Sequence, residues 1–158
     1  MENQSFESFY LSTRDDCFRA LIVAVGSAHE ADDLLAEAYT RALERWSHVR
    51  EHSAPKAWVL SVATNLRRDR WRKAKRSLRV WNRLETDAPS PPIDPTLTAA
   101  LAGLSDQQRL AVAYRVFLDL DTATTARSMG VSPGTVTTHL HRALGHLREE
   151  LHDYEVTP

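Results

Sequence analysis

SAPKAWVLSVATNLRRDRWRKAKRSLRVWNR, residues 53–83, reads as one continuous helix with two different halves. Pro55 suits a first helical turn, where its missing N–H costs nothing, and Ser53 or Ala54 lies at the cap. The first half repeats apolar residues at helical spacing and so turns one face inward: Trp58, Val59, Val62, Ala63 and Leu66. The second half is basic. The pattern therefore predicts one helix whose first half packs in a hydrophobic core and whose second half binds a polyanion.

Positive charge is concentrated in the second half of this segment. The 158-residue chain has a formal net charge of −1. Residues 67–83 nevertheless hold nine Lys or Arg against one acid, with Trp71 and Trp81 among them. Local positive charge with interleaved aromatic side chains is typical of a surface that contacts phosphates and stacks bases. A solvated helix end or a basic linker is the alternative that the charge run leaves open.

Length and composition place the chain among small intracellular proteins. Its length suits one ordinary domain or two small ones. The single cysteine, Cys17, excludes an internal disulfide and a multi-cysteine zinc site, and it favours the reducing cytoplasm. No apolar run approaches the roughly 20 residues that cross a bilayer, and the first residues lack the order of a signal peptide. We therefore expect a cytoplasmic protein without membrane insertion, metal or other cofactor.

Two helices are expected before this segment. The first covers about residues 5–25 and ends at Gly26, which permits a left-handed stop. The second covers about residues 30–47, and a loop of residues 48–54 follows it. Acidic residues line the face of the second helix opposite its apolar one: Asp33, Glu37 and Glu44. Such a stripe is usually solvated surface, but it could equally dock a basic partner helix.

A proline-rich segment separates two predicted domains. Residues 84–96 hold four of the seven prolines and show no helical period, so we expect an extended linker between residues 1–83 and residues 97–158. The second domain is helical by pattern, with a helix that begins at Ser105 and has Gln108 as its capping-box partner. The inward face of that helix is expected to be Leu110, Ala113, Val116 and Phe117. The predicted fold class is all-α, with two small helical domains and a helix-turn-helix in the C-terminal one.

The helix-turn-helix is predicted near the C-terminus. A short helix from Asp121 or Thr122 to Met129 precedes Gly130, and Ser132 then caps a long helix. The buried seam of that helix is expected to be Val136, Leu140, Ala143, Leu144, Leu147 and Leu151. Its exposed start would enter the major groove. An ordinary helical hairpin is the alternative, and the net charge of −5 over residues 84–158 requires any DNA contact to be narrow.

Three segments in this order resemble the bacterial RNA polymerase sigma factors of the extracytoplasmic-function type, which keep only the second and fourth conserved sigma regions. EADDLLAEAYTRALERW, residues 30–46, is similar to the polymerase-binding segment. Residues 53–76 resemble the segment that opens and reads the minus-ten promoter element. Residues 104–151, LSDQQRLAVAYRVFLDLDTATTARSMGVSPGTVTTHLHRALGHLREEL, resemble the reader of the minus-thirty-five element.

The resemblance implies a dissociable initiation subunit that binds core RNA polymerase and promoter DNA, catalyses nothing itself and could be held by an anti-sigma factor. It places four residues against the clamp coiled coil of the polymerase: Asp32, Asp33, Leu34 and Glu37. The loop of residues 46–55 would cradle an unstacked base. The separated strand would be held by Asn65, Arg67, Arg68, Arg72, Lys73 and Arg76. The major groove would receive Thr135, Thr137, Thr138, His139 and Arg142.

This sequence departs from the family pattern at three places. Ala36 stands where a glutamine is common, and basic residues are usual at Thr137 and His139. Thr124 and Thr125 replace a frequent Glu–Ile pair, which predicts looser packing of that helix. Two rival functions are a helix-turn-helix regulator that is not a polymerase subunit and a helical scaffold. An enzyme is disfavoured, because no histidine lies in a metal-binding motif and no phosphate loop or nucleophile elbow is present.

Overall fold

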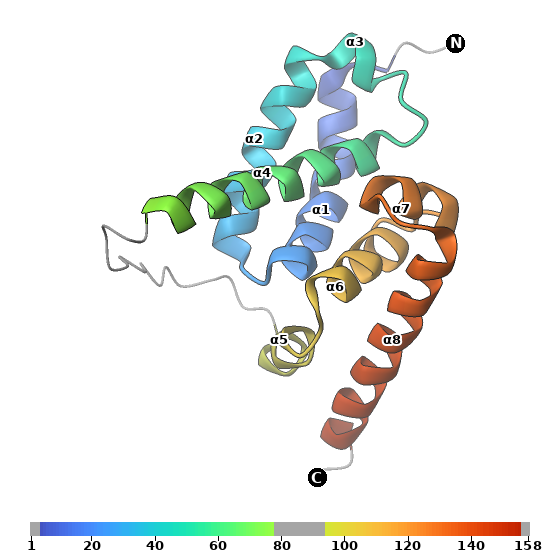
Figure 1. Ribbon diagram of the computed structural model, residues 1–158. Helices are drawn as coiled ribbons and strands as arrows, with labels where there is room; N and C mark the ends of the chain where they lie inside the picture. Colours follow the sequence, from blue (N-terminus) through green and yellow to red (C-terminus); the bar gives the residue numbers. More distant parts are fainter. Residues whose placement is uncertain (1–3, 78–93, 156–158) are drawn as a thin grey trace.

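The computed structural model describes residues 4–77 and 94–155, and every regular element within these ranges is a helix (Figure 1). This confirms the predicted all-α class. The helices form two successive units, α1 to α4 and α5 to α8. The part of the predicted linker between residues 84 and 93 lies outside the described residues, as does the end of the basic segment.

The first unit is built from α1 (Phe6–Val25), α2 (Ala28–Glu44), α3 (Trp46–Val49) and α4 (Pro55–Ser77). Its helix ends follow from local chemistry. The Ser5 hydroxyl accepts a hydrogen bond from the Ser8 backbone N–H at 3.1 Å and caps α1. Gly26 ends α1 with φ of 80°, a left-handed conformation that glycine adopts without steric cost.

Aromatic side chains fill one end of this first unit. The rings of Phe9 and Trp46 lie 5.2 Å apart between centroids, and the Tyr10 and Tyr39 rings meet edge to face at 4.9 Å. The Tyr39 hydroxyl lies 2.8 Å from the hydroxyl of Thr13, so both buried oxygens have a partner. Burial raises the pKa of the Cys17 thiol to about 11, so this cysteine stays protonated and packs as a small apolar side chain.

Helix α4 has the two halves that the sequence predicts. Its first half is buried against α1 and α2 through Ala57, Val59, Leu60 and Ala63. Its second half projects beyond the bundle, as the green end of the helix shows in Figure 1, and its side chains are exposed from residue 68 to residue 76. One helix therefore runs from a packed core to an exposed basic rod.

The second unit is built from α5 (Pro95–Ala102), α6 (Asp106–Val112), the π-helical turn η1 (Ala113–Phe117), α7 (Thr122–Met129) and α8 (Pro133–Glu155). The capping box at Ser105 and Gln108 is present in both directions, at 3.0 and 3.2 Å. Asp94 caps α5, so this helix begins inside the segment expected to be linker.

The π-helical turn η1 changes which side chains face inward. A π turn holds one more residue than an α turn, so the residues after it shift in phase. Val116, expected to be buried, is 51% exposed, whereas Tyr114 is only 1% exposed. On α8, Leu144 was also expected inside and is 38% exposed. The rest of the expected α8 seam is wholly or partly buried.

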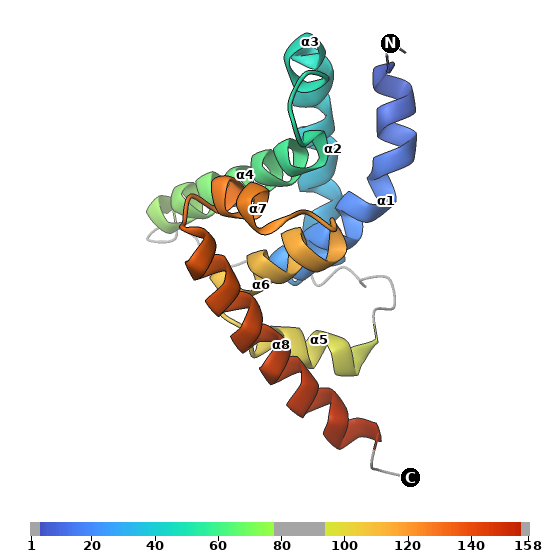
Figure 2. The same cartoon turned by 90° about the vertical axis from the view of Figure 1, so that its right-hand side faces the viewer.

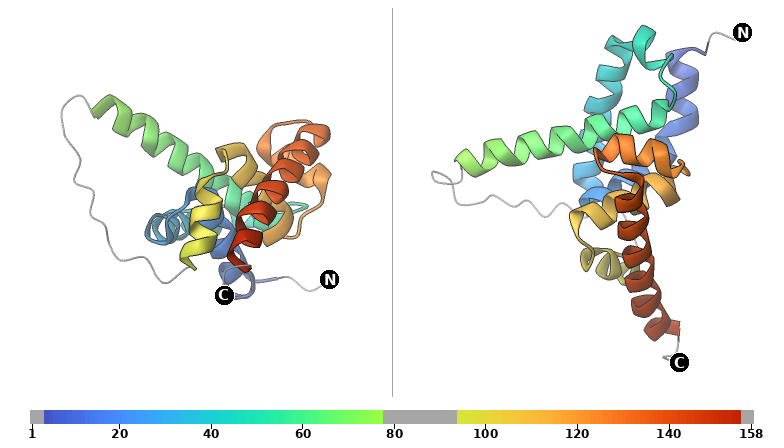
Figure 3. Two further views of the ribbon diagram at one scale, coloured as in Figure 1. Left: turned by 90° about the horizontal axis from the view of Figure 1, so that it is seen from below. Right: turned by 45° about the vertical axis from the view of Figure 1, so that its right-hand side comes forward.

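The two units share one hydrophobic core. Helix α1 packs against both α6 and η1, and α4 packs against α7, as Figures 2 and 3 show from other directions. Leu101, Val112, Tyr114 and Leu118 belong to the same buried cluster as the apolar residues of α1, α2 and α4. Contacts thus bring residues of the two predicted domains into direct apposition, which local sequence patterns did not predict.

Candidate functional surfaces

An acidic surface lies on the outer face of α2. Asp32 and Asp33 are exposed, and Glu37 is partly exposed with a 3.3 Å ion pair to Arg41. Leu34, which the resemblance assigned to the same surface, is 0% exposed. It is buried because α2 packs against both α1 and α4, so its inward face is wide. The acidic surface is therefore Asp32, Asp33 and Glu37 without Leu34.

A shallow hollow of about 260 Å³ adjoins this acidic surface between α1 and α2. Phe18, Leu35 and Tyr39 contribute apolar atoms to it, while Arg14 and Asp32 stand among its other lining residues. Ala36, where the family commonly has glutamine, also lines it. A methyl group at this position leaves room for a partner side chain but offers it no hydrogen bond.

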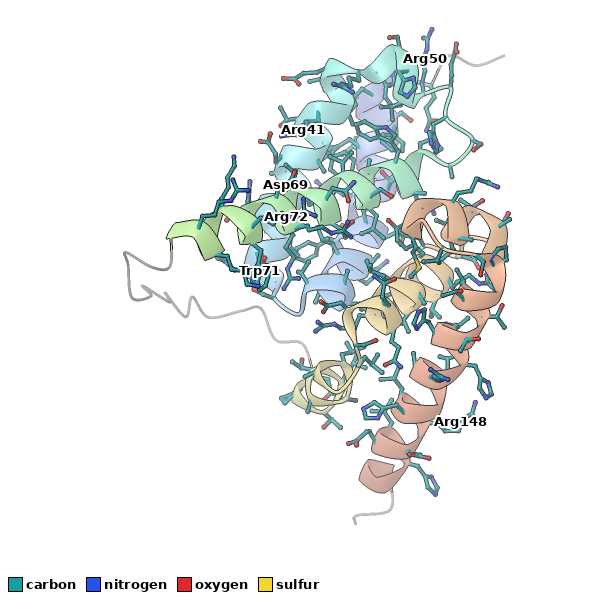
Figure 4. The ribbon with its side chains drawn as sticks, viewed as in Figure 1. Arg41, Arg50, Asp69, Trp71, Arg72 and Arg148 are labelled. Atoms are coloured by element: carbon teal, nitrogen blue, oxygen red, sulfur yellow. The ribbon has the colours of Figure 1, made fainter. Side chains whose placement is uncertain are left out.

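The second half of α4 presents a basic surface to solvent, part of which is visible in Figure 4 around the labelled Trp71 and Arg72. The exposed side chains include those of Arg68, Arg70, Arg72, Lys73, Lys75 and Arg76. Asp69 partly offsets this charge, with its carboxylate 3.9 Å from the Arg72 guanidinium. Trp71 is 57% exposed, and the Lys75 ammonium lies 4.2 Å from the centroid of its ring. A surface of this composition can hold phosphates and stack a base.

Arg67 differs from the other basic residues of α4. Its Nε donates to the Glu30 carboxylate at 3.0 Å, and its terminal nitrogen contacts the Val25 carbonyl at 3.5 Å. The side chain is partly buried between α4 and the first turn of α2. In this conformation Arg67 joins two helices of the first unit, and Asn65 lies on the exposed side one turn before the basic surface.

The loop before α4 is shorter than the sequence predicts. Helix α3 occupies residues 46–49, and Val49 is fully buried. Trp46 packs on Phe6 and Phe9, so this ring is part of the core rather than a free stacking surface. Residues 51–53 remain exposed, and the His52 ring accepts a hydrogen bond from the Ala54 N–H at 3.0 Å.

The predicted helix-turn-helix is present in α7 and α8. Gly130 ends α7 in the left-handed region with φ of 69°, and the Ser132 hydroxyl accepts from the Thr135 N–H at 3.2 Å to cap α8. Thr137 and Thr138 are exposed, but their hydroxyls donate to backbone carbonyls of their own helix at 3.1 and 3.0 Å. Arg142 is the exposed cation of this face. The face offers hydroxyl acceptors with little positive charge.

A cleft of about 830 Å³ separates α4 from the second unit. Arg68 and Trp71 line its α4 side, and Asp106 and His139 line the opposite side. His139 is partly buried, and its Nδ1 has no hydrogen-bond partner within the described residues. The cleft thus brings together residues from both predicted DNA-binding surfaces, although Arg68 and His139 are 71 positions apart in the sequence.

The described residues form neither a metal centre nor a membrane-spanning helix. Within residues 4–77 and 94–155, no group of three or more His, Cys, Asp or Glu side chains is placed to hold a metal ion. Over the same ranges, no helix combines the length and apolar character that crossing a bilayer requires.

Comparisons with known proteins match both units. The family model described as Sigma-70 region 2 matches residues 12–77, and the one described as Sigma-70, region 4 matches residues 96–147. The RNA polymerase sigma-E factor of Streptomyces coelicolor is 32% identical, over 92% of this chain and 85% of the relative. The ECF RNA polymerase sigma factor SigW of Bacillus subtilis is 26% identical, over 87% of this chain and 81% of the relative.

The fold also matches a solved structure. The chain superposes on the co-crystal structure of the sigma factor RpoE in complex with the anti-sigma factor NepR from Bartonella quintana, with a TM-score of 0.77 and 21% identity. The match covers 97% of this chain and 98% of that chain. At this identity the likeness concerns the fold.

Proposed function

The chain belongs to the extracytoplasmic-function sigma factors of bacterial RNA polymerase, and on that premise we propose which of its surfaces performs each step of initiation. It is a subunit that binds core RNA polymerase and directs transcription to specific promoters. A regulator that binds DNA without joining the polymerase is disfavoured, because the region 2 match covers the unit that such a regulator would not need. The assignment of individual residues is our proposal.

The acidic surface of α2 docks on the polymerase. Asp32 and Asp33 project from a helix whose opposite face is buried, so the carboxylates are held by a rigid element. The neighbouring hollow can receive a partner side chain. Carboxylates presented in this way attract a basic partner and suppress acidic ones. This exposed acidic face is the observation on which the proposed docking rests.

The basic surface of α4 holds the separated strand of the promoter. Phosphate contacts from Arg68, Arg72, Lys73 and Arg76 would supply most of the affinity. Trp71 offers an exposed ring on which an unpaired base can stack, a contact worth about 1–3 kcal/mol. That gain offsets the few kcal/mol that unstacking a base costs. Asn65 would add a neutral donor and acceptor beside the strand.

The start of α8 reads intact duplex upstream. Thr135, Thr137, Thr138 and His139 would lie against the groove, with Arg142 as the main phosphate or guanine contact. No catalytic step is assigned to the chain, since nucleotide addition belongs to the polymerase. The subunit would act in the cytoplasm, where the polymerase and its promoters are. A solved sigma factor of this fold is bound to an anti-sigma factor, and a similar inhibitor could cover the acidic and basic surfaces here.

A core-binding measurement tests the docking face directly. Asp33→Arg combined with Glu37→Arg should abolish binding of the purified chain to core polymerase, because two attractive contacts become repulsive. Glu149→Arg combined with Glu150→Arg is the matched control, since both residues are exposed on the far part of α8. Equal binding by both variants would contradict the assigned face. Sequencing the transcripts that core enzyme initiates with the wild-type chain would then test function and reveal the promoter.

A further inference from the structure

The cleft between α4 and the second unit has the size and the lining of a small-molecule site. Its volume of about 830 Å³ lies within the roughly 300–1,000 Å³ that ligand pockets enclose. Apolar side chains from both units form much of its wall: Ala24, Val25, Leu110, Met129 and Val131. An apolar wall with a few convergent polar groups is the lining that binds an organic ligand in a fixed orientation.

One face of α4 supplies the wall on the side of the first unit. Four residues follow helical spacing and so lie along this face: Ser61, Thr64, Arg68 and Trp71. At its inner end the Ser61 hydroxyl lies 2.7 Å from the Tyr114 hydroxyl, which fixes α4 against η1. At its outer end Trp71 lies on the side of α4 that faces the second unit (Figure 4). Arg68 and Trp71 are therefore presented to the cleft by a helix that is anchored beside it.

The charges of the lining leave one arginine without a charged partner. Arg67 pairs with Glu30 at 3.0 Å, and Asp106 pairs with Arg109 on its own helix, so the charges of these two lining residues are largely offset. Arg68 has no carboxylate within ion-pair distance among the described residues. Its guanidinium can hold a phosphate through two parallel hydrogen bonds. A single unpaired arginine suits a ligand with one phosphoryl group rather than a polyphosphate.

Trp71 gives the cleft an aromatic surface. Its ring is 57% exposed, and the Lys75 ammonium lies over it, 4.2 Å from the centroid. Lys75 covers one face of the indole, which leaves the other face for a planar ligand. Any nucleobase gains affinity by stacking on such a ring, since every base has a π-face. The cleft therefore suits an anion that carries an aromatic ring.

The second unit contributes two further polar groups. Gln107 of α6 is partly buried, and its side-chain amide offers the donor and the acceptor that the edge of a base requires. The Nδ1 atom of His139 is buried without a hydrogen-bond partner among the described residues. Buried polar atoms are normally paired, and a ligand hydroxyl or phosphate oxygen in the cleft would pair this one. A ligand in the cleft would thus be recognised by residues from both units.

We propose that this cleft binds a nucleoside monophosphate, whose base stacks on Trp71 and whose phosphate is held by Arg68. Gln107 and His139 complete the polar contacts from the second unit. The site goes beyond the proposed function, because binding needs neither polymerase nor promoter. It has one consequence for initiation that does rest on that function. Arg68 and Trp71 are also assigned to the separated strand, so a bound nucleotide would exclude the strand from them.

Calorimetric titration of the free chain with AMP and with GMP tests the site. Wild type should bind one equivalent of at least one of them, and Arg68→Ala and Trp71→Ala should each weaken that binding about tenfold. Arg70→Ala is the matched control, since it removes the same charge from the exposed half of α4 but does not line the cleft. The matching nucleoside and inorganic phosphate, the separate halves of the ligand, should each bind about tenfold more weakly or less.

Three results would overturn the nucleotide site. One is the absence of saturable binding by either nucleotide. Another is an equal loss of affinity in Arg68→Ala and Arg70→Ala, which would mean that the whole basic surface attracts the anion. The third is binding of inorganic phosphate as tight as that of the nucleotide, which would exclude a contribution from the base.

Open-complex formation tests the consequence for initiation. Nucleotide added to wild type before core polymerase should lower the yield. Gln107→Leu should bind the nucleotide about fivefold more weakly, the effect of losing one hydrogen bond, and should need about fivefold more nucleotide for the same inhibition. Gln107 lies on neither predicted DNA-binding surface, so the yield without nucleotide should be unchanged in this variant. Equal inhibition of both chains would mean that the nucleotide acts on the polymerase itself, and would overturn the competition. Failure of wild type to bind core polymerase would instead overturn the proposed function, while nucleotide binding to the free chain would still be measured.

Discussion

The exposed half of α4 and the start of α8 are both helix faces assigned to promoter DNA, yet they differ in how they can bind it. On α4, six exposed Lys or Arg side chains surround Trp71 between residues 68 and 76. On α8, Thr137 and Thr138 use their hydroxyl protons within the helix, and Arg142 is the exposed cation of the face. Binding through α4 should therefore be strong, salt-dependent and weakly selective, whereas α8 depends on the fit of its turn into the groove.

Removing charge from α4 should have the largest effect. In Arg72→Ala combined with Arg76→Ala, two phosphate contacts to a single strand are lost, which reduces the log–log salt slope of open-complex formation by about 1.4. At 0.15 M salt this corresponds to about tenfold weaker open-complex formation. The measurement is open-complex yield on a promoter found by transcript sequencing, across a salt series. Neither residue lines the cleft between α4 and the second unit.

The control for this experiment is Arg148→Ala, an exposed arginine far along α8 that Figure 4 labels. It removes one positive charge from the chain without touching either DNA-binding surface. A salt slope that falls as much in Arg148→Ala as in the α4 variant would mean that net charge, rather than the basic surface, governs binding.

Adding charge to α8 should reduce the difference between the two faces. Thr137→Arg places a cation where the family often has one, on an exposed position of the groove-facing turn. One new phosphate contact should raise the salt slope of duplex binding by about 0.9 and tighten binding about fivefold at 0.15 M salt. Fluorescence anisotropy with upstream promoter duplex measures both. Thr98→Arg on α5 is the control, because it adds the same charge at an exposed position outside the groove-facing turn. A salt slope of duplex binding that Thr137→Arg leaves unchanged would show that this turn does not approach the phosphates.

Local signals in the sequence predicted the helices well because each depends on a few neighbouring residues. The capping box at Ser105, the start of α7 at Thr122 and the left-handed Gly130 are all present as predicted. The π-helical turn has no such signal, and it moved Val116 outward and Tyr114 inward. A burial prediction from helical spacing assumes the same rotation per residue along the whole helix. One extra residue in a turn rotates the following side chains away from their predicted positions.

Long-range pairings account for what the sequence did not predict at the candidate site. Arg67 belongs to a basic run, and nothing local distinguishes it from Arg68, but Glu30 on α2 binds it. Ser61 and Tyr114 are 53 residues apart, and neither lies in a motif. Leu34 follows two acidic residues that remain exposed, yet contacts from α1 and α4 bury it. Each outcome depends on how helices pack, which the order of residues along one helix does not specify.

The helix-turn-helix contains a polar defect whose removal should stabilise the fold. Thr125 of α7 is 0% exposed, and its hydroxyl has no hydrogen-bond partner within the described residues. Thr125→Val keeps the shape and replaces the unsatisfied hydroxyl by a methyl group, so the free energy of unfolding should rise by about 1 kcal/mol. Urea unfolding measures this. Thr40→Val, at an exposed hydroxyl that donates to the Ala36 carbonyl at 2.9 Å, should bring no gain.

The smallest expected effect concerns the pH dependence of the same motif. Asp121 caps α7, and its carboxylate accepts a hydrogen bond from the Thr124 N–H at 2.6 Å. Hydrogen bonds from the Thr124 backbone and side chain hold the pKa of this carboxyl below its usual range. Because the folded-state pKa is below the unfolded one, the ionised cap stabilises the fold above about pH 4, and that contribution is lost as the pH falls through the folded pKa.

Asp121→Asn tests this contribution, because it keeps an acceptor at the N-cap and cannot titrate. The variant should match wild type closely at pH 7 and lose less stability than wild type between about pH 5 and pH 3. Thermal unfolding midpoints across this range provide the measurement, with Asp121→Ala as the variant that loses the cap at every pH. Parallel curves for wild type and Asp121→Asn would mean that the cap acts as a neutral acceptor. The charge at the start of α7 would then contribute no stability to the second unit. Charge would matter little for the folding of the helix-turn-helix, just as it contributes less to DNA binding by the start of α8 than by the basic surface of α4.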